Sequence, residues 1–110
     1  MAPTLGSFEH VILLAVLHLG EEAYAVSIRE EIERRTGGAV ARGAVYTTLM
    51  RLEGKGMLRS RMGDPTPVRG GRAKRFYALS PAGAASLREA RSALLEAWPR
   101  SAGLLEERGG

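Results

Sequence analysis

Apolar side chains recur at helical spacing near the start of the chain, between residues 7 and 19. Ser7 can act as the N-cap of this first predicted helix, and Gly20 as its C-cap. A helix that carries apolar side chains on two opposite sides must be covered by protein on each of them. We therefore expect one side to face the domain core and the other side to face a second subunit. The first side carries Phe8, Val11, Ile12, Ala15, Val16 and Leu19, and the second carries Leu13, Leu14 and Leu17.

A second helix is predicted from about Tyr24 to Thr36, where Gly37 and Gly38 end it. Its narrow apolar stripe consists of Tyr24, Ala25, Ile28 and Ile32. Its outer face carries Arg29, Glu30, Glu33 and Arg34. We interpret the acidic residues Glu30, Glu31 and Glu33 as a solvated helix face, not as a catalytic pair of carboxylates.

The third predicted helix runs from about Arg42 to Lys55 and has two contrasting faces. At about 100° per residue, the core-facing side carries Val45, Thr48, Leu49 and Leu52. The opposite side carries Gly43, Tyr46, Thr47 and Met50, flanked by Arg51, with Arg42 at the helix start. This face contains no acid, and its short polar and aromatic groups suit contacts with base edges and phosphates. The alternative is that Tyr46 and Met50 cover a neighbouring helix.

Two short strands follow, from Leu58 to Arg61 and from Arg75 to Leu79. The segment between them, from Met62 to Lys74, is rich in proline and glycine and is predicted to be a loop. Two strands joined by a basic loop are typical of a wing. Basic residues of this wing can reach a phosphate backbone or a minor groove, and they are Arg69, Arg72, Lys74 and Arg75.

The last helix is predicted from Ala82 to about Glu106, with Ser80 as its N-cap and Pro81 at its first position. Pro99 is expected to kink or break it. About 25 residues of helix extend beyond any core that 80 residues can build, so we expect a homodimer. Its interface would include Val11, Leu14, Leu87, Leu94, Trp98 and Leu105.

Basic residues are concentrated in one part of this 110-residue chain, whose net charge is +4. Residues 42–75 contain nine basic and two acidic side chains, whereas residues 1–41 contain three basic and six acidic ones. Neutralisation of nucleic-acid phosphates is the commonest reason for such segregation.

The residue types that catalysis needs are scarce in this chain. There is no cysteine, and the histidines are only His10 and His18, which we interpret as ordinary helix residues. We therefore expect no enzyme, no metal site and no cofactor. The longest apolar run extends from Val11 to Leu17. It is far shorter than the run of about 20 residues that a helix needs to cross a bilayer. A cytoplasmic protein that does not contact a membrane is expected.

Several motifs of the chain resemble those of the PadR-type transcriptional regulators. The most specific are Tyr46-x-x-Leu49-x-Arg51-Leu52-Glu53 and, downstream, Tyr77-x-Leu79-Ser80-x-x-Gly83. The resemblance covers nearly the whole chain and implies a mainly α (α+β) fold. In that fold, a winged helix-turn-helix domain, residues 1–80, precedes a C-terminal dimerisation helix, residues 81–110. Two departures are Ala41, where the family has a small polar residue before the recognition helix, and Ala25, where it favours glycine.

The resemblance also implies a function. Relatives are cytoplasmic dimers, usually repressors, that bind pseudo-palindromic operator DNA with the third helix and the wing. Some relatives bind planar drugs on an aromatic residue of the last helix, at a position similar to Trp98. Trp98 either packs the dimer interface or lines a cavity that takes a small aromatic effector. The alternative function is a winged-helix module that binds protein and not DNA.

Overall fold

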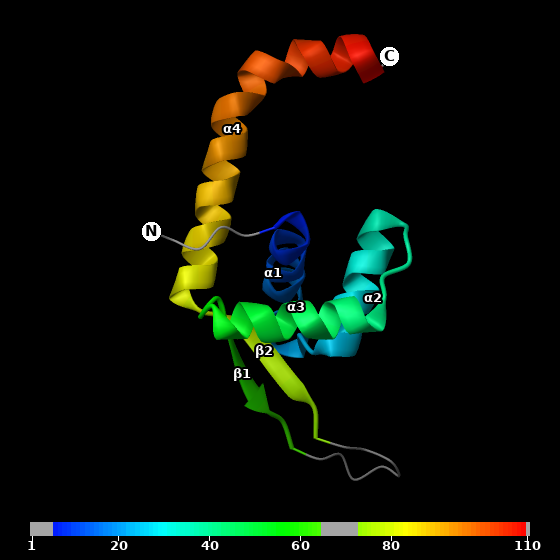
Figure 1. The fold of residues 1–110 in the computed structure, drawn as a ribbon, viewed down its shortest axis with the longest axis vertical. Helices are drawn as coiled ribbons and strands as arrows, with labels where there is room; N and C mark the ends of the chain where they lie inside the picture. Colours follow the sequence, from blue (N-terminus) through cyan, green and yellow to red (C-terminus); the bar gives the residue numbers. More distant parts are fainter. Residues whose placement is uncertain (1–5, 65–72, 110) are drawn as a thin grey trace.

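The computed structural model describes the backbone of residues 6–64 and 73–109, and their side chains except at 98–103 and 105–109. Three helices come first, then a two-stranded antiparallel sheet, then one long helix (Figure 1). The elements are α1 (Ser7–Leu19), the 3-10 turn η1 (Gly20–Glu22), α2 (Ala25–Thr36), α3 (Arg42–Gly54), β1 (Leu58–Met62), β2 (Arg75–Leu79) and α4 (Pro81–Gly109). Every predicted helix and strand is present, with boundaries shifted by a few residues.

The core lies where α1, α2 and α3 meet one another and the wing strands. Its largest fully buried side chains are Ile12, Leu13, Ile28, Val45, Leu49 and Leu52. The expected position of Leu13 on the outer side of α1 is wrong. Because α1 contacts α2, α3, α4 and β2, it buries more than one face. Leu14 and Leu17 remain exposed, as a narrower stripe than the sequence predicted.

The N-cap of α1 is Gly6 and not Ser7, which is the first helical residue. The Glu9 carboxylate accepts a hydrogen bond from the Gly6 backbone N–H at 2.9 Å. A glutamate at the third helical position often satisfies the N-cap donor in this way. The helix therefore begins one residue earlier than the Ser7 hydroxyl indicated.

The wing strands pair in the register Leu58↔Leu79, Ser60↔Tyr77 and Met62↔Arg75. The other edge of β2 is also partly paired. The Tyr77 N–H donates to the carbonyl of Ala23 at 2.8 Å, and Tyr24 forms an isolated bridge with Phe76. The base of the wing is thereby tied to the segment that leads into α2. Arg69 and Arg72 lie outside the residues that the structure describes.

The start of α4 is locked onto the turn that follows α3. The Ser80 hydroxyl donates to the Gly56 carbonyl at 2.5 Å and accepts the Gly83 N–H at 3.0 Å. A Cβ atom on Gly83 would lie 2.1 Å from the Met57 carbonyl oxygen, so only glycine fits there. The Ser-x-x-Gly motif is therefore explained by close packing of α4 on the turn between α3 and β1.

Helix α4 spans 29 residues, and its axis bends in its C-terminal part (Figure 1). Pro99 was expected either to kink or to break this helix. The helix continues through Pro99, so it bends and does not break. Only its first turns lie beside α1, and the rest extends away from the other elements (Figure 1). Within the described part of the chain, no helix has the length and apolar character that a membrane span requires.

Candidate nucleic-acid interface

One face of α3 is buried and the other is exposed, as the sequence predicted. Val45, Thr48, Leu49 and Leu52 are buried. On the opposite face, Tyr46 is 48% exposed and Met50 is 72% exposed. The remaining members of the predicted contact face are exposed too, and they are Arg42, Gly43, Thr47 and Arg51. Tyr46 lies beside Val26 and Arg29 of α2, so the alternative in which Tyr46 and Met50 cover a neighbouring helix stays open.

The N-terminus of α3 is open. Its N-cap, Ala41, offers no side-chain acceptor, as expected from that residue type. A Cβ atom on Gly43 would meet nothing within 4 Å, so the first turn is sterically accessible. The N–H groups of a first helical turn carry partial positive charge and bind anionic oxygens.

The turn between α2 and α3 is held by two side chains of α2. Arg29 Nε donates to the Val40 carbonyl at 2.7 Å, and Glu33 Oε2 accepts the Val40 N–H at 2.8 Å. The two side chains also lie 3.7 Å apart as an ion pair. The prediction of Arg29 and Glu33 as a solvated outer face is thus incomplete, because they fix the backbone that sets the angle between the two helices.

The solvated face expected for Glu31 is wrong, since its side chain is 3% exposed. Its carboxylate accepts hydrogen bonds from Arg34 and Arg35, one turn further along α2. Burial of a carboxylate requires such partners. Arg34 and Arg35 are therefore engaged within α2, as Arg29 is with Val40 and Glu33.

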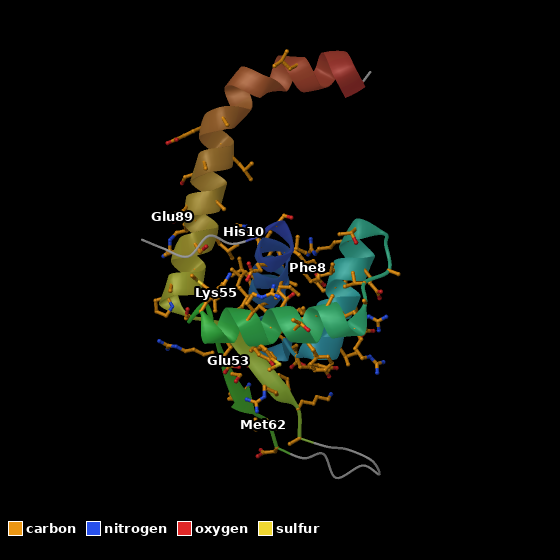
Figure 2. All side chains as sticks on the ribbon, viewed as in Figure 1. Phe8, His10, Glu53, Lys55, Met62 and Glu89 are labelled. Atoms are coloured by element: carbon orange, nitrogen blue, oxygen red, sulfur yellow. The ribbon has the colours of Figure 1, made fainter. Side chains whose placement is uncertain are left out.

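The C-terminal end of α3 is anchored to α1. Lys55 Nζ lies 3.0 and 3.1 Å from the two oxygens of the buried Glu9 carboxylate. Burial raises the pKa of Glu9, but the Gly6 N–H, the Lys55 ammonium and the charge of Arg51 outweigh it, so the net pKa lies below the ordinary glutamate value. Figure 2 shows Lys55 at the end of α3 that lies next to α4.

A second link joins α3 to the wing. The Ser60 hydroxyl donates to Glu53 Oε2 at 2.5 Å and accepts a hydrogen bond from Arg75 Nη1 at 2.9 Å. Glu53 lies on the side of α3 that faces the strands (Figure 2). Burial raises the pKa of the adjacent Tyr77, and the charge of Glu53 adds to this effect. Arg75, predicted as a phosphate contact, is therefore already engaged within the wing.

Aromatic rings and cations meet at the base of the wing. The Tyr24 and Phe76 rings pack edge to face with centroids 5.7 Å apart. Arg61 lies over Phe76 at 4.8 Å, and Lys74 Nζ lies 4.3 Å from the centroid of the Tyr24 ring. The face of an aromatic ring attracts a cation, so these contacts hold Arg61 beside Phe76 and Lys74 beside Tyr24. The side chain of Lys74 is exposed and lies at the root of the predicted wing loop.

The residues predicted for a dimer interface fall into three groups. Val11 and Leu87 are partly buried against the core of the same chain. Leu14 and Leu94 are exposed, Leu94 by 68%. The side chains of Trp98 and Leu105 lie outside the described part of the structure. Within the described residues, no cluster of His, Asp and Glu side chains could hold a metal ion.

Three helices followed by a two-stranded antiparallel wing define a winged helix-turn-helix domain, here extended by one long helix. The chain belongs to the transcriptional regulator PadR-like family, whose model matches residues 13–89. This is a family of transcriptional regulators and not of enzymes.

Individual relatives agree with this assignment. The chain is 39% identical over 87 residues to the transcriptional regulator Rv3488 of Mycobacterium tuberculosis, covering 77% of each protein. It is similar in fold to a PadR-like transcription factor of Bacteroides fragilis, with a TM-score of 0.69, 23% identity and 88% of each chain covered. It is also similar to Bacillus subtilis PadR in complex with operator DNA, with a TM-score of 0.62 and 21% identity, over 76% of this chain and 47% of that one.

Proposed function

We propose that this regulator binds double-stranded DNA sequence-specifically, with α3 in the major groove and the wing on the flanking backbone. The observation that carries the proposal is the exposed, acid-free face of α3, on which Tyr46, Thr47 and Met50 lie between Arg42 and Arg51. The major groove admits an α-helix, and it displays a donor and acceptor pattern that differs for each base pair. The operator complex of the B. subtilis relative supports this proposal.

The parts of this surface have different tasks in the proposal. The side chains of Thr47, Met50 and Tyr46 contact base edges and therefore select the sequence. Arg42, Arg51 and Lys74 neutralise phosphates and therefore supply affinity that depends on salt. The open first turn of α3 gives a phosphate oxygen access to backbone N–H groups.

We further propose that the active form is a homodimer acting as a repressor in the cytoplasm, on a pseudo-palindromic operator. Exposed leucines on α1 and α4 support this oligomeric state, because a second chain can cover large apolar side chains that one chain leaves exposed. They are Leu14, Leu17, Leu94, Leu95 and Leu104. A two-fold dimer presents two copies of α3 to two half-sites about one turn of DNA apart.

Release by a small aromatic effector stays a prediction, as does its site at Trp98. If α4 pairs with its copy, two Trp98 indoles approach each other and offer a stacking surface. Quenching of tryptophan emission by planar aromatic compounds would support that site. A closed interface with unresponsive tryptophan emission would favour plain packing of Trp98.

The proposal is tested by titrating a duplex from the protein's own promoter region, and a shuffled duplex of the same composition, at several salt concentrations. Sequence-specific DNA binding predicts tighter binding to the promoter duplex. It also predicts a steep loss of affinity with salt, about 0.9 counterion per phosphate contact. The alternative, a winged-helix module that binds protein, predicts weak association that changes little with salt.

A further inference from the structure

The base of the wing is joined to the residues that lead into α2. The carbonyl of the fully buried Ala23 accepts the Tyr77 N–H at 2.8 Å. The next residue, Tyr24, is the N-cap of α2 and bridges Phe76 of β2. The Tyr24 N–H in turn donates to the Ser27 hydroxyl of α2 at 3.0 Å. The place of the Tyr24 ring is therefore set by the wing and by α2 together.

Lys74 is held at the root of the wing loop by its backbone. Its carbonyl accepts the Gly63 N–H at 2.7 Å, which continues the strand pairing one residue beyond Met62 and Arg75. A Cβ atom on Gly63 would lie 2.5 Å from Phe76 Cε2, so the Phe76 ring covers this glycine closely. Side chains two residues apart on a paired strand project from the same face, so Lys74 and Phe76 share one face of the wing.

The Lys74 ammonium lies against an aromatic ring and not against an acid. Its Nζ atom is 4.3 Å from the centroid of the Tyr24 ring, which packs edge to face on Phe76 at 5.7 Å. Lys74 forms no ion pair with any residue in the described ranges, 6–64 and 73–109. A ring attracts a cation without neutralising it. The exposed ammonium therefore keeps its charge and can still meet an anion.

We propose that Tyr24 is a positioning residue for DNA binding, whose ring holds the Lys74 ammonium where it meets a phosphate of the duplex. This inference rests on the proposed function, in which Lys74 neutralises a phosphate. A lysine side chain that moves freely loses rotamer entropy when it binds, and a lysine already restrained by a ring loses less. Because Tyr24 acts through a phosphate contact, its effect is the same on every DNA sequence.

The first test compares variants of the full chain in equilibrium titrations of the promoter duplex and the shuffled duplex. Tyr24→Leu keeps an apolar side chain but removes the ring, and should weaken binding to both duplexes by about two- to fivefold. Tyr24→Phe keeps the ring and is the conservative variant that should restore the affinity. In a Lys74→Ala background, Tyr24→Leu should cause no further loss, because the contact it supports is already absent.

A second measurement needs no DNA. Lys55 and Lys74 are the two lysines of the chain. Protons that lie over the face of an aromatic ring resonate upfield, so the ε-methylene protons of Lys74 should lie upfield of their position in the unfolded chain. Tyr24→Leu should remove this displacement and Tyr24→Phe should retain it. Lys55, which is paired with Glu9, should keep its resonances in both variants and so report that they are folded.

The proposal is wrong if the Lys74 protons of the unsubstituted protein resonate where they do in the unfolded chain. It is also wrong if Tyr24→Leu weakens DNA binding equally with and without Lys74→Ala, because Tyr24 then acts on the fold and not through Lys74. A loss confined to the promoter duplex, or an equal loss with Tyr24→Phe, contradicts it as well. Failure of the unsubstituted protein to bind either duplex overturns the proposed function itself, whereas the other results overturn the role of Tyr24 alone.

Discussion

Lys55 Nζ lies 3.0 Å from Glu9 Oε2, an ion pair that joins the residue after α3 to the first turn of α1. The Glu9 carboxylate is buried and also accepts the N–H of Gly6, the N-cap of α1, so it both caps α1 and joins that helix to the end of α3. Because Lys55 follows directly on α3, this pair fixes the end of the proposed recognition helix relative to the face of α1 that carries Leu14 and Leu17.

Glu9→Gln should lower the free energy of unfolding by about 1–3 kcal/mol at pH 7, because the buried Lys55 contact loses its anion. The folded-state pKa of Glu9 lies below its ordinary value, so its contribution to the free energy of unfolding is fully present only well above that ordinary value of 4.5. That contribution is lost as the pH falls through the folded-state pKa, and the two proteins should then converge. Urea unfolding at a series of pH values measures both effects. Glu89→Gln, an exposed change on α4, is the control, and equal stability of Glu9→Gln and its parent at pH 7 would contradict the account.

The link between α3 and the wing predicts that Arg75 acts through Ser60. We expect Ser60→Ala, which loses its hydrogen bonds to both Glu53 and Arg75, to weaken DNA binding at least as much as Arg75→Ala. The double variant should be no weaker than Ser60→Ala, because the Arg75 hydrogen bond is already lost there. Equilibrium titrations of one promoter duplex with the four proteins complete the cycle. If Ser60→Ala binds normally while Arg75→Ala flattens the salt dependence, Arg75 contacts a phosphate directly.

Substitutions on α3 and on the wing should have different signatures. Thr47→Ala removes a proposed base contact and should change the preferred base at one operator position, by about 1–3 kcal/mol of discrimination. Lys74→Ala removes a phosphate contact and should weaken binding about equally on all sequences, reducing the salt slope by about 1. Affinities for a set of single-base operator variants at two salt concentrations separate the two. A uniform loss for Thr47→Ala would show that it does not select bases.

The close approach of α4 to the turn after α3 predicts a contrast between two glycines. Gly83→Ala places a Cβ atom 2.1 Å from the Met57 carbonyl oxygen and should cost about 1–3 kcal/mol of stability. Gly43→Ala meets nothing within 4 Å and should stabilise α3 by up to about 1 kcal/mol, because alanine is the better helix former. Thermal unfolding of both variants checks this, and equal melting temperatures would contradict it.

The parts of the fold that follow from local periodicity could be predicted from the sequence. Val45, Leu49 and Leu52 lie on the core side of α3 because helical spacing alone puts them there. Ser80 and Pro81 mark the start of α4 because capping is a property of neighbouring residues.

The parts that depend on distant partners could not be predicted. Leu13 is buried because α1 has neighbours on several sides, which its own pattern does not reveal. Glu31 is buried and paired with the exposed Arg34 and Arg35, a pairing that its spacing permits but does not require. Arg75 of β2 donates a hydrogen bond to the Ser60 hydroxyl of β1. Its basic charge, which is all that the sequence shows, predicted a phosphate contact instead. Such assignments need the tertiary contacts.

The proposed dimer places two α3 helices on one face of the duplex. A hydroxyl-radical footprint of the protein's own promoter region measures this arrangement. We expect two protected stretches about 10 base pairs apart. Leu94→Asp, which puts a charge on the exposed apolar side of α4, should protect neither stretch, whereas Ser92→Asp on another side of the same helix should protect both. A single protected stretch, or an unchanged footprint with Leu94→Asp, would contradict the account.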